Sequence, residues 1–551
     1  MNKYIHCLSI ILLLILGQHI HAQEIKFTPP FDFPILFSGN FGEIRTNHFH
    51  GGLDFKTQGV IRKPMRALAD GYISHIRVTH GSGYMLDVVY ENGYTTICRH
   101  LDDFIGEMAQ RVKALQYEQE NWEVEIVPEP DEYPVKAGQV IALSGNTGYS
   151  FGPHLHLDMI ETESGDYIDP LPFFAPLVKD HTAPRAESYM LFPQPGQGVV
   201  NGKQEPHRIA TRKQQPVTAW GIIGAGIEAY DYMEGAYNKY GVHTVILEVD
   251  SVEIFRSVVD RFANEENLYI NSWTYDKCMK SFIDPGNPLR MLHAKNNNRG
   301  LITIDEERPY KFHYILSDVL GNTSHAYFTI HGKRSEIAPM PQREKHIFRW
   351  DKVNFLQEPG LELLVPKGRL YEDAYLDYAV KADSGDIAFT YQLSKRRIPM
   401  HDYADLKISL RQKPAADSNK YYIVSVNERG KKYYVGGKCE NGVITARIRE
   451  LGTYTVAIDT IPPHINIFDQ RNLGRNGKIS IYAHDSESGI SSYRGTIDGK
   501  YALFGKRNSL QNNLEYQLDA EHVEKGKQHT LEMTVTDRRG NSITKEYSFY
   551  W

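Results

Sequence analysis

Cysteine is scarce in this chain, which limits how its domains can be held together. The 551 residues include 4 cysteines. Cys7 lies close to the N-terminus, and Cys98, Cys278 and Cys439 are far apart in the sequence. Three such distant cysteines do not form a disulfide framework, even in an oxidising compartment. We therefore expect the domains to be stabilised by their hydrophobic cores alone.

The sequence also lacks a strong charge and a long apolar run. Its formal net charge is -6 and no block of basic residues occurs, which argues against nucleic acid as a partner. After the N-terminus, no stretch is apolar enough to span a bilayer. Hydrophobic residues make up 41% and charged residues 24%, as in ordinary globular proteins. This length predicts about three to five domains.

The first 22 residues resemble a secretion signal. Lys3 supplies the positive start, residues 8–16 form a short apolar core, and "HIHAQ" offers a cleavage site after Ala22. A retained membrane anchor is the alternative, but the apolar run is short for a membrane span. Cys7 precedes the apolar core, which argues against a bacterial lipoprotein. We predict secretion across the inner membrane, a periplasmic or envelope-associated protein, and no transmembrane segment after signal removal.

Residues 24–178 form the first predicted domain. Their segments alternate apolar and polar residues between glycine turns, which is typical of β-strands. Residues 103–118 are the exception, because their apolar residues recur at helical spacing and predict an inserted helix. That helix either forms one wall of a cleft or lies on the surface away from it.

An internal repeat organises the rest of the chain. Three motifs recur in the same order: "DHTAP" and "DTIPP", "AYDYMEG" and "AHDSESG", "DVLGN" and "DRRGN". Their short alternating strands predict immunoglobulin-like β-sandwiches at 179–337 and 459–551, with a further β-rich domain at 338–458 between them. The repeated aspartates are more typical of backbone hydrogen bonds in turns than of calcium ligands, the alternative interpretation.

Four histidines and one aspartate of the first domain indicate chemistry. His50 and Asp54 lie in "HFHGGLDF", His100 lies in "TTICRHL", and His154 and His156 lie in "GPHLHLD". Residues two apart on a strand point to the same face. Two imidazoles and one carboxylate are the protein ligands of hydrolytic zinc sites, which leave a fourth position for water.

These motifs, with "PVKAGQVIALSGNTG", resemble the successive motifs of the LytM/lysostaphin-type zinc metallopeptidases over about residues 36–170. The resemblance implies an antiparallel β-sheet domain of the duplicated hybrid motif type in a mainly β protein. It implies that His50, Asp54 and His156 bind Zn²⁺ and that His100 and His154 are catalytic. Either of these two could be the base and the other the partner of the oxyanion, and we expect His154 to be the base. His48 is a rival ligand that we expect to be structural or to line the groove.

Two positions depart from the family pattern. Cys98 stands where a tyrosine is usual, and on a regular strand it shares a face with His100. We expect it to be buried and inert rather than reactive. Asp158 stands where a glutamate is usual, and it is placed to orient a histidine ring.

The resemblance implies a secreted zinc metalloendopeptidase that hydrolyses peptidoglycan peptides through a zinc-bound water. D-alanyl cross-links and glycyl-glycine bridges are both substrates in the family, and we predict a D,D-endopeptidase. Two alternatives are a catalytically inactive regulator of other wall hydrolases, which requires substituted ligands, and a surface-binding protein that acts through its sandwiches.

Overall fold

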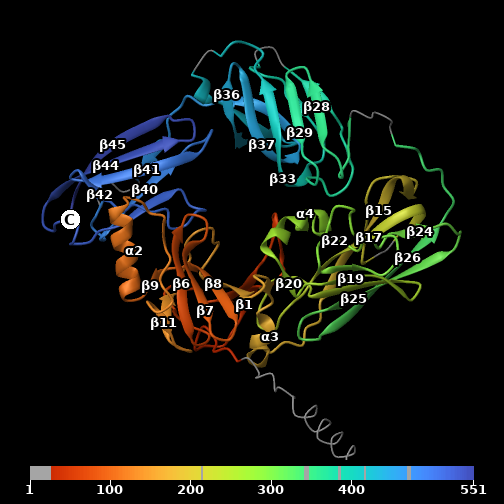
Figure 1. Cartoon of the computed structure of the whole chain (residues 1–551), viewed down its shortest axis with the longest axis horizontal. Coiled ribbons are helices and arrows are strands. Elements are labelled where there is room, and N and C mark those ends of the chain that lie inside the picture. The colour runs from red at the N-terminus through yellow and green to blue at the C-terminus, as the bar shows by residue number, and fades with distance from the viewer. Residues whose placement is uncertain (1–25, 213–214, 341–345, 383–385, 415–416, 468–472) are drawn as a thin grey trace, which may run out of the picture.

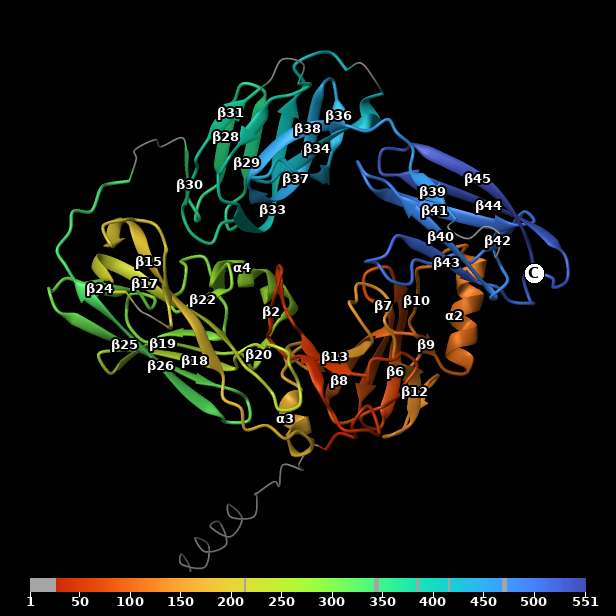
Figure 2. The ribbon, with the colours of Figure 1, turned by 180° about the vertical axis from the view of Figure 1, so that it is seen from behind.

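The computed structural model describes residues 26–551, except 213–214, 341–345, 383–385, 415–416 and 468–472. Strands dominate, and four β-rich lobes follow one another around a ring (Figure 1). The view from behind shows the same ring, with the last lobe against helix α2 (Glu107–Glu118) of the first lobe (Figure 2). The prediction of a mainly β protein is confirmed.

The first lobe is built on an antiparallel sheet that carries the histidine motifs. In order, its main strands are β1 (Phe37–Gly39), β4 (Gly52–Lys56), β13 (His154–Glu161), β8 (Tyr94–Leu101), β7 (Gly83–Tyr90), β6 (Gly71–Thr79) and β10 (Val124–Ile126). The short strands of this lobe are β2 (Ile44–Arg45), β3 (His48–Phe49), β5 (Pro64–Arg66), β9 (Asp103–Phe104), β11 (Pro134–Val135), β12 (Val140–Leu143) and β14 (Tyr167–Ile168).

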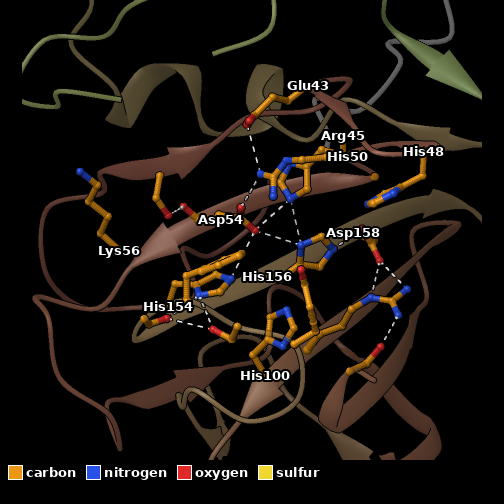
Figure 3. Close-up of a pocket in the computed structure, with 18 of the residues that line it drawn as sticks. Glu43, Arg45, His48, His50, Asp54, Lys56, His100, His154, His156 and Asp158 are labelled. Atoms are coloured by element: carbon orange, nitrogen blue, oxygen red, sulfur yellow. Dashed lines mark hydrogen bonds and ion pairs between the residues drawn. The ribbon is translucent and has the colours of Figure 1, made fainter. Parts of the chain in front are cut away.

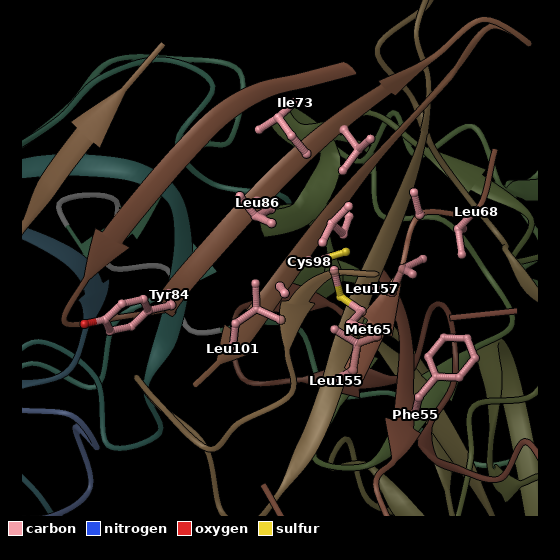
Figure 4. Close-up of a cluster of buried hydrophobic side chains, with 14 of the residues drawn as sticks. Phe55, Met65, Leu68, Ile73, Tyr84, Leu86, Cys98, Leu101, Leu155 and Leu157 are labelled. Carbon is pink, nitrogen blue, oxygen red and sulfur yellow. The ribbon is translucent and has the colours of Figure 1, made fainter. Parts of the chain in front are cut away.

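Alternation along β13 separates the core of this lobe from its polar groove. Leu155, Leu157 and Met159 are at most 1% exposed and point into the hydrophobic cluster. Leu155 and Leu157 lie there among side chains from the neighbouring strands (Figure 4). Burial of one such side chain contributes about 1.5–3 kcal/mol to stability. His154 and His156, which alternate with these residues along the strand, therefore point to the opposite face.

The inserted helix is confirmed, but it begins later than the spacing predicted. Residues 103–104 form strand β9, which pairs with β12, and α2 begins at Glu107. Met108 and Val112 of α2 are buried against the first lobe. The helix lies between the first and last lobes and is not part of the groove lining described below.

The second lobe contains a large sheet and joins the first. Its main strands, in order, are β16 (His207–Ala210), β15 (Arg185–Val200), β17 (Thr218–Tyr230), β26 (Thr323–Gly332), β25 (Pro309–Ser317), β18 (Thr244–Val249), β19 (Val252–Val258) and β23 (Leu292–Ala294). Smaller elements of this lobe are β20 (Arg261–Phe262), η2 (Asn264–Tyr269), α4 (Ile270–Trp273), β21 (Thr274–Tyr275), β22 (Cys278–Lys280) and β24 (Ile302–Ile304). Before it, α3 (Leu171–Phe174) buries Leu171 and Phe174 in the core of the first lobe, and η1 (Ala175–Leu177) follows α3.

The cores of the first two lobes interlock. Phe49, which precedes His50, is 2% exposed and packs near Phe262 and Trp273 of the second lobe. In the opposite direction, the hydroxyl of Tyr240 donates a hydrogen bond to the carbonyl of Phe37 at 2.8 Å. The segment that carries His50 is therefore fixed by both lobes.

The third lobe contains two five-stranded sheets and a pair of short strands, and the fourth contains a three-stranded and a four-stranded sheet. The third contains β27 (Ile347–Phe348), β28 (Asn354–Glu358), β29 (Leu361–Val365), β30 (Ala374–Tyr375), β31 (Ala379–Lys381), β32 (Thr390–Gln392), β33 (Ile398–Ser409), η4 (Ser418–Lys420), β34 (Tyr421–Val426), β35 (Lys432–Gly436), β36 (Lys438–Glu440), β37 (Val443–Leu451) and β38 (Thr453–Ile458). The fourth contains β39 (His464–Asn466), β40 (Lys478–His484), β41 (Ile490–Ile497), β42 (Lys500–Ala502), β43 (Asn513–Gln517), β44 (Gln528–Asp537) and β45 (Ser542–Tyr550). Their immunoglobulin-like topology stays a prediction.

The repeated aspartate motifs make the same contacts in the second and fourth lobes. The Asn322 side chain donates to Asp318 at 2.7 Å and to the carbonyl of Asp180 at 3.3 Å. In the fourth lobe, the equivalent Asn541 donates to Asp537 at 2.7 Å and to the carbonyl of Asp459 at 3.2 Å. In both lobes an aspartate carboxylate thus accepts from the asparagine four residues later, and that asparagine also donates to a backbone carbonyl near the start of the lobe.

The remaining expectations concern cysteines and membranes. Cys98, Cys278 and Cys439 are buried and unpaired with one another. Among the residues that the structure describes, no helix has the length and hydropathy required to cross a membrane. The predicted signal peptide, including Cys7, lies outside the described residues.

Candidate metal centre and its groove

Antiparallel pairing of β4 and β13 brings two predicted ligands together. His156 lies directly opposite Asp54, so both side chains project from the same face of the sheet. Gly52 lies opposite Asp158, where an added Cβ would be 1.9 Å from the carbonyl oxygen of Leu157. Glycine at this position therefore permits the close approach of the two strands.

His50 completes a compact triangle of ligand atoms. Its Nε2 lies 2.9 Å from Asp54 Oδ1 and 2.9 Å from His156 Nδ1. His156 Nδ1 is also 2.9 Å from Asp54 Oδ1. The three side chains converge in the groove (Figure 3). One zinc ion with ~2.0–2.1 Å bonds holds its ligand atoms ~3.3 Å apart, so this triangle fits zinc after a small expansion.

The hydrogen bonds behind the triangle determine which ring nitrogens are free. His50 Nδ1 donates to the carbonyl of Asn40 at 2.6 Å, because a carbonyl only accepts. His156 Nε2 lies 2.6 Å from Asp158 Oδ1 and donates to that carboxylate. In the neutral rings, His50 Nε2 and His156 Nδ1 therefore direct lone pairs at Asp54 Oδ1. Three electron-rich atoms that face one another are the donor set of a cation.

The close packing of these side chains also shifts the pKa values of His156 and Asp54. Burial would lower the pKa of His156, but Asp158 and Asp54 outweigh it and raise that pKa to about 9. Burial would raise the pKa of Asp54, but His50 and His156 hold it well below its usual range. Without a metal, a proton on His156 partly balances the carboxylates, and a metal ion competes with that proton.

Arg45 is a neighbour of the triangle that the sequence motifs did not reveal. Its Nη2 donates to Asp54 Oδ2 at 3.1 Å and to Glu43 Oε2 at 3.2 Å. It thus occupies the second oxygen of the predicted ligand and leaves Oδ1 for a metal. Arg45 lies on β2, and the pairing of β2 with β3 places it beside Asp54. No local sequence pattern indicated which arginine would lie there.

His100 and His154 lie beside the triangle with their rings fixed in the same way. Each ring donates from Nδ1 to a backbone carbonyl at 2.8 Å, that of Thr147 for His100 and that of Gly152 for His154. Their ring centroids are 4.9 Å apart, and His154 Nε2 lies 3.6 Å from Asp54 Oδ1. The Nε2 atoms are therefore the ones left for substrate or water.

Burial disfavours the charged form of both of these histidines. Burial, with smaller contributions from His154 and His156, lowers the pKa of His100 to about 3. Burial also lowers the pKa of His154 below its ordinary value. A neutral imidazole with a proton on Nδ1 presents an unprotonated Nε2, which is the form required of a general base.

The other residues that the sequence singled out, His48, Asp158 and Cys98, lie near the triangle but do not belong to it. His48 is exposed at the groove, hydrogen-bonds the carbonyl of Thr46 at 2.9 Å, and is not part of the triangle. Asp158 orients His156, and Arg99 Nε donates to its other oxygen at 2.9 Å. Cys98 is 2% exposed in the hydrophobic cluster, and burial raises the pKa of its thiol to about 12, so the thiol is inert.

The expectation that Cys98 and His100 share a face was wrong. His100 has φ of 62°, and the pairing of β8 with β7 shifts register between Tyr84 and Leu86. This irregularity rotates the chain by one residue, so that Cys98 faces the core while His100 faces the groove. A regular alternation could not have predicted it.

Residues from two lobes line the groove. It encloses about 1520 Å³, enough for a peptide of several residues. The first lobe contributes the triangle of His50, Asp54 and His156, the two histidines beside it, and the exposed rings of Tyr149 and Phe151. The second lobe contributes Phe262, Asn264 and Asn267. These three residues were not predicted, because their approach depends on how the lobes dock.

Strand pairing and charged contacts fix the second lobe in this position. β14 pairs with β20, with Tyr167 opposite Phe262. Arg290 of the second lobe donates two hydrogen bonds to Asp166 at 2.9 and 3.0 Å. The Oδ1 atom of Asn267 accepts a hydrogen bond from the backbone of Phe49 at 3.1 Å. The groove wall is therefore part of a continuous structure.

Two parts of the chain are similar to known proteins or protein families. A family model described as a Zu5-like domain matches residues 345–459. ALE-1, a glycyl-glycine endopeptidase of Staphylococcus capitis, is 30% identical over 128 residues, which are 22% of this chain and 28% of that protein. The chain thus spans less than a third of this curated relative. The similarity confirms the resemblance to the LytM/lysostaphin-type metallopeptidases.

Two solved structures are also similar to part of the chain. The catalytic domain of lysostaphin, an antimicrobial peptidase from Staphylococcus simulans, is 26% identical, with a TM-score of 0.19, and the match covers 25% of this chain and 89% of that one. A zinc-containing peptidase from Vibrio cholerae is 26% identical, with a TM-score of 0.19, and the match covers 25% of this chain and 37% of that one.

Proposed function

We propose that this protein is a secreted zinc metalloendopeptidase that hydrolyses peptide bonds in peptidoglycan. The observation that carries the proposal is the triangle of His50, Asp54 and His156, in which two imidazole lone pairs and a carboxylate oxygen face one another at 2.9 Å. The resemblance to LytM/lysostaphin-type peptidases supports the same reaction class. We place the enzyme in the periplasm or at the cell envelope.

The residues of the groove divide the reaction between them. Bound Zn²⁺ would supply Lewis acidity to the scissile carbonyl and to the attacking water. His154 Nε2, 3.6 Å from Asp54 Oδ1, accepts the proton of that water. The protonated His154 then gives this proton to the amine of the departing peptide, and we assign His100, whose Nε2 also faces the groove, to a position beside the scissile carbonyl.

Arg45, Asn40 and Asp158 keep the ligands in place for this reaction. The carbonyl of Asn40 and the carboxylate of Asp158 fix the two imidazole tautomers. Arg45 restrains the oxygen of Asp54 that points away from the triangle. Such contacts orient ligands before the metal arrives and reduce the rearrangement that binding requires.

The D-alanyl cross-link is our predicted substrate bond, and the glycyl-glycine bridge is the alternative that the name of the relative favours. The test incubates the zinc-loaded full chain with purified peptidoglycan of each cross-link type and identifies the released muropeptides by mass spectrometry. Cleaved D-alanyl cross-links would support the proposal, and glycine-terminated fragments would favour the alternative. Intact peptidoglycan with a zinc-loaded protein would favour the inactive regulator instead.

A further inference from the structure

The last lobe reaches the loop that precedes strand β13, although more than 350 residues separate them in the chain. Gly148 donates its amide hydrogen to the carbonyl of Arg507 at 2.7 Å, and Ser509 donates to the carbonyl of Gly148 at 2.8 Å. Between these two backbone contacts, Asn508 Nδ2 donates to the carbonyls of Ser150 and Asn146 at 2.9 and 3.1 Å. We call residues 145–153 the histidine loop.

The histidine loop supplies the acceptors that orient His100 and His154. The carbonyl of Thr147 accepts from His100, and the carbonyl of Gly152 accepts from His154. The two carbonyls held by Asn508 belong to residues 146 and 150, so they lie on either side of Thr147 in the chain. A shift of this loop would therefore move the acceptors of both rings together.

The loop is tightly constrained on its inner side as well. Gly148 has φ of 72°, and an added Cβ would lie 2.4 Å from the backbone nitrogen of Gly83. The amide of Tyr149 donates to the carbonyl of Gly81 at 2.7 Å. The loop is thus held between the β6–β7 turn of its own lobe and the segment 507–509 of the last lobe.

The last lobe holds this loop without entering the groove. The residues that line the groove belong to positions 33–267, and none of its described lining residues comes from the third or fourth lobe. Contact with the loop therefore leaves the substrate path open. The last lobe is therefore placed to support the catalytic residues and not to block the groove.

A broader interface keeps the last lobe in place. Arg507 Nη2 donates to the carbonyl and to Oδ1 of Asp102, at 2.9 and 2.8 Å. The ring of Tyr117 on α2 stacks on His522, with centroids 3.7 Å apart. Trp122 covers Gly505, where an added Cβ would lie 2.2 Å from the indole. None of these contacts involves the Asn508 side chain, so its replacement leaves their atoms in place.

We propose that Asn508 is a positioning residue, through which the last β-lobe holds the histidine loop in the form that orients His100 and His154. The inference rests on the proposed peptidase function for its kinetic readout, but its structural readout is independent of that function. The last lobe thereby becomes a required part of the active site and not an accessory binding domain.

The test compares three variants of the zinc-loaded full chain. Asn508→Asp keeps the size of the side chain but removes both donated hydrogen bonds and places a carboxylate against two carbonyl oxygens. Asn508→Ala removes the side chain. Asn512→Ala is the matched control, because the Asn512 side chain contacts His484 within its own lobe. Kinetics on a muropeptide substrate and hydrogen exchange of residues 145–153 are measured on each.

We expect kcat to fall roughly 10- to 100-fold in both Asn508 variants, because small displacements of catalytic groups have effects of this size. Zinc content stays within about twofold of the parent protein because none of the predicted ligands belongs to the loop, and KM rises less than kcat falls because the loop supplies only part of the groove lining. Hydrogen exchange accelerates in residues 145–153 and stays unchanged in α2. The Asn512→Ala variant matches the parent protein in every measurement.

Three results would overturn the inference. Unchanged kcat and unchanged exchange in Asn508→Asp would show that the contact positions nothing. Faster exchange in both the histidine loop and α2 would show that the lobe has undocked. A rise in kcat would show that the contact restrains activity. If the parent protein hydrolyses nothing, the proposed function fails, while hydrogen exchange still tests whether Asn508 orders the loop.

Discussion

His156 Nε2 lies 2.6 Å from Asp158 Oδ1, two residues further along the same strand. Because β13 alternates its side chains, both residues face the groove while Leu157 between them is buried. The carboxylate fixes the proton on Nε2 and turns the Nδ1 lone pair towards Asp54. A strand with a two-residue period thus places the proposed metal ligand and its orienting partner side by side.

Replacement of Asp158 by asparagine tests this relationship. The Asp158→Asn variant loses the negative charge that favours a proton on His156 Nε2, so we expect zinc affinity to fall roughly 10- to 100-fold with the fold intact. Competition with a zinc chelator measures the affinity. Asp87→Asn is the control, because Asp87 pairs with Arg77 on the same sheet and does not touch the triangle. Equal zinc affinity in both variants would contradict the role of Asp158.

His156→Ala is expected to abolish both zinc binding and hydrolysis. The substitution removes one of the three ligand atoms and leaves two, too few for a stable catalytic site. Metal analysis of the purified variant and a muropeptide assay give the two readouts. Full activity in a protein that contains no zinc would reject the assignment.

His154→Ala is expected to retain zinc and to lose turnover. A missing general base lowers the rate roughly 10²- to 10⁴-fold. Equilibrium dialysis with zinc and a single-turnover assay separate binding from chemistry. If this variant loses its metal instead, His154 is a ligand and the roles of the two histidines on β13 are exchanged.

Asp231 gives a prediction about stability and pH. Burial, with smaller effects from Asp318 and Asp180, raises its pKa to about 8, and its Oδ1 has no hydrogen-bond partner among the described residues. The folded state therefore binds more protons than the unfolded state between about pH 4 and pH 8, so its stability falls as pH rises through that window.

Asp231→Asn should remove this dependence. With a chelator present, the midpoint of thermal unfolding of the variant should match that of the parent protein near pH 5 and exceed it near pH 8. We expect a difference of roughly 1–3 kcal/mol at pH 8, since a pKa unit corresponds to about 1.4 kcal/mol and water entry relieves part of the cost. A constant difference across the range would show that Asp231 does not titrate in the folded protein.

The predicted ligand set is encoded locally in the sequence, and the structure brings its three side chains together. His50 and Asp54 are four residues apart, His154 and His156 are two apart, and strand alternation determines where they point. The mainly β fold could also be predicted, because apolar and polar residues alternate in short segments between glycine turns. The inserted helix was placed four residues too early, because Asp103 and Phe104 pair with β12 instead of joining the helix.

Other features depend on contacts that no local pattern encodes. The positive φ of His100 reverses the faces of β8 and moves Cys98 into the core. Asn267 reaches the groove through docking of the second lobe, and Asn508 reaches the histidine loop through docking of the fourth. Such contacts join residues hundreds of positions apart, and single polar side chains in loops carry no periodic signal.

X-ray absorption spectroscopy of the zinc-loaded full chain tests the central assignment most directly. We predict one zinc ion per chain with only nitrogen and oxygen neighbours at ~2.0–2.1 Å and the multiple scattering of two imidazoles. His50→Ala and His156→Ala should each eliminate the bound ion. A sulfur neighbour at ~2.3 Å, or a zinc shell that is unchanged in both variants, would contradict the assignment.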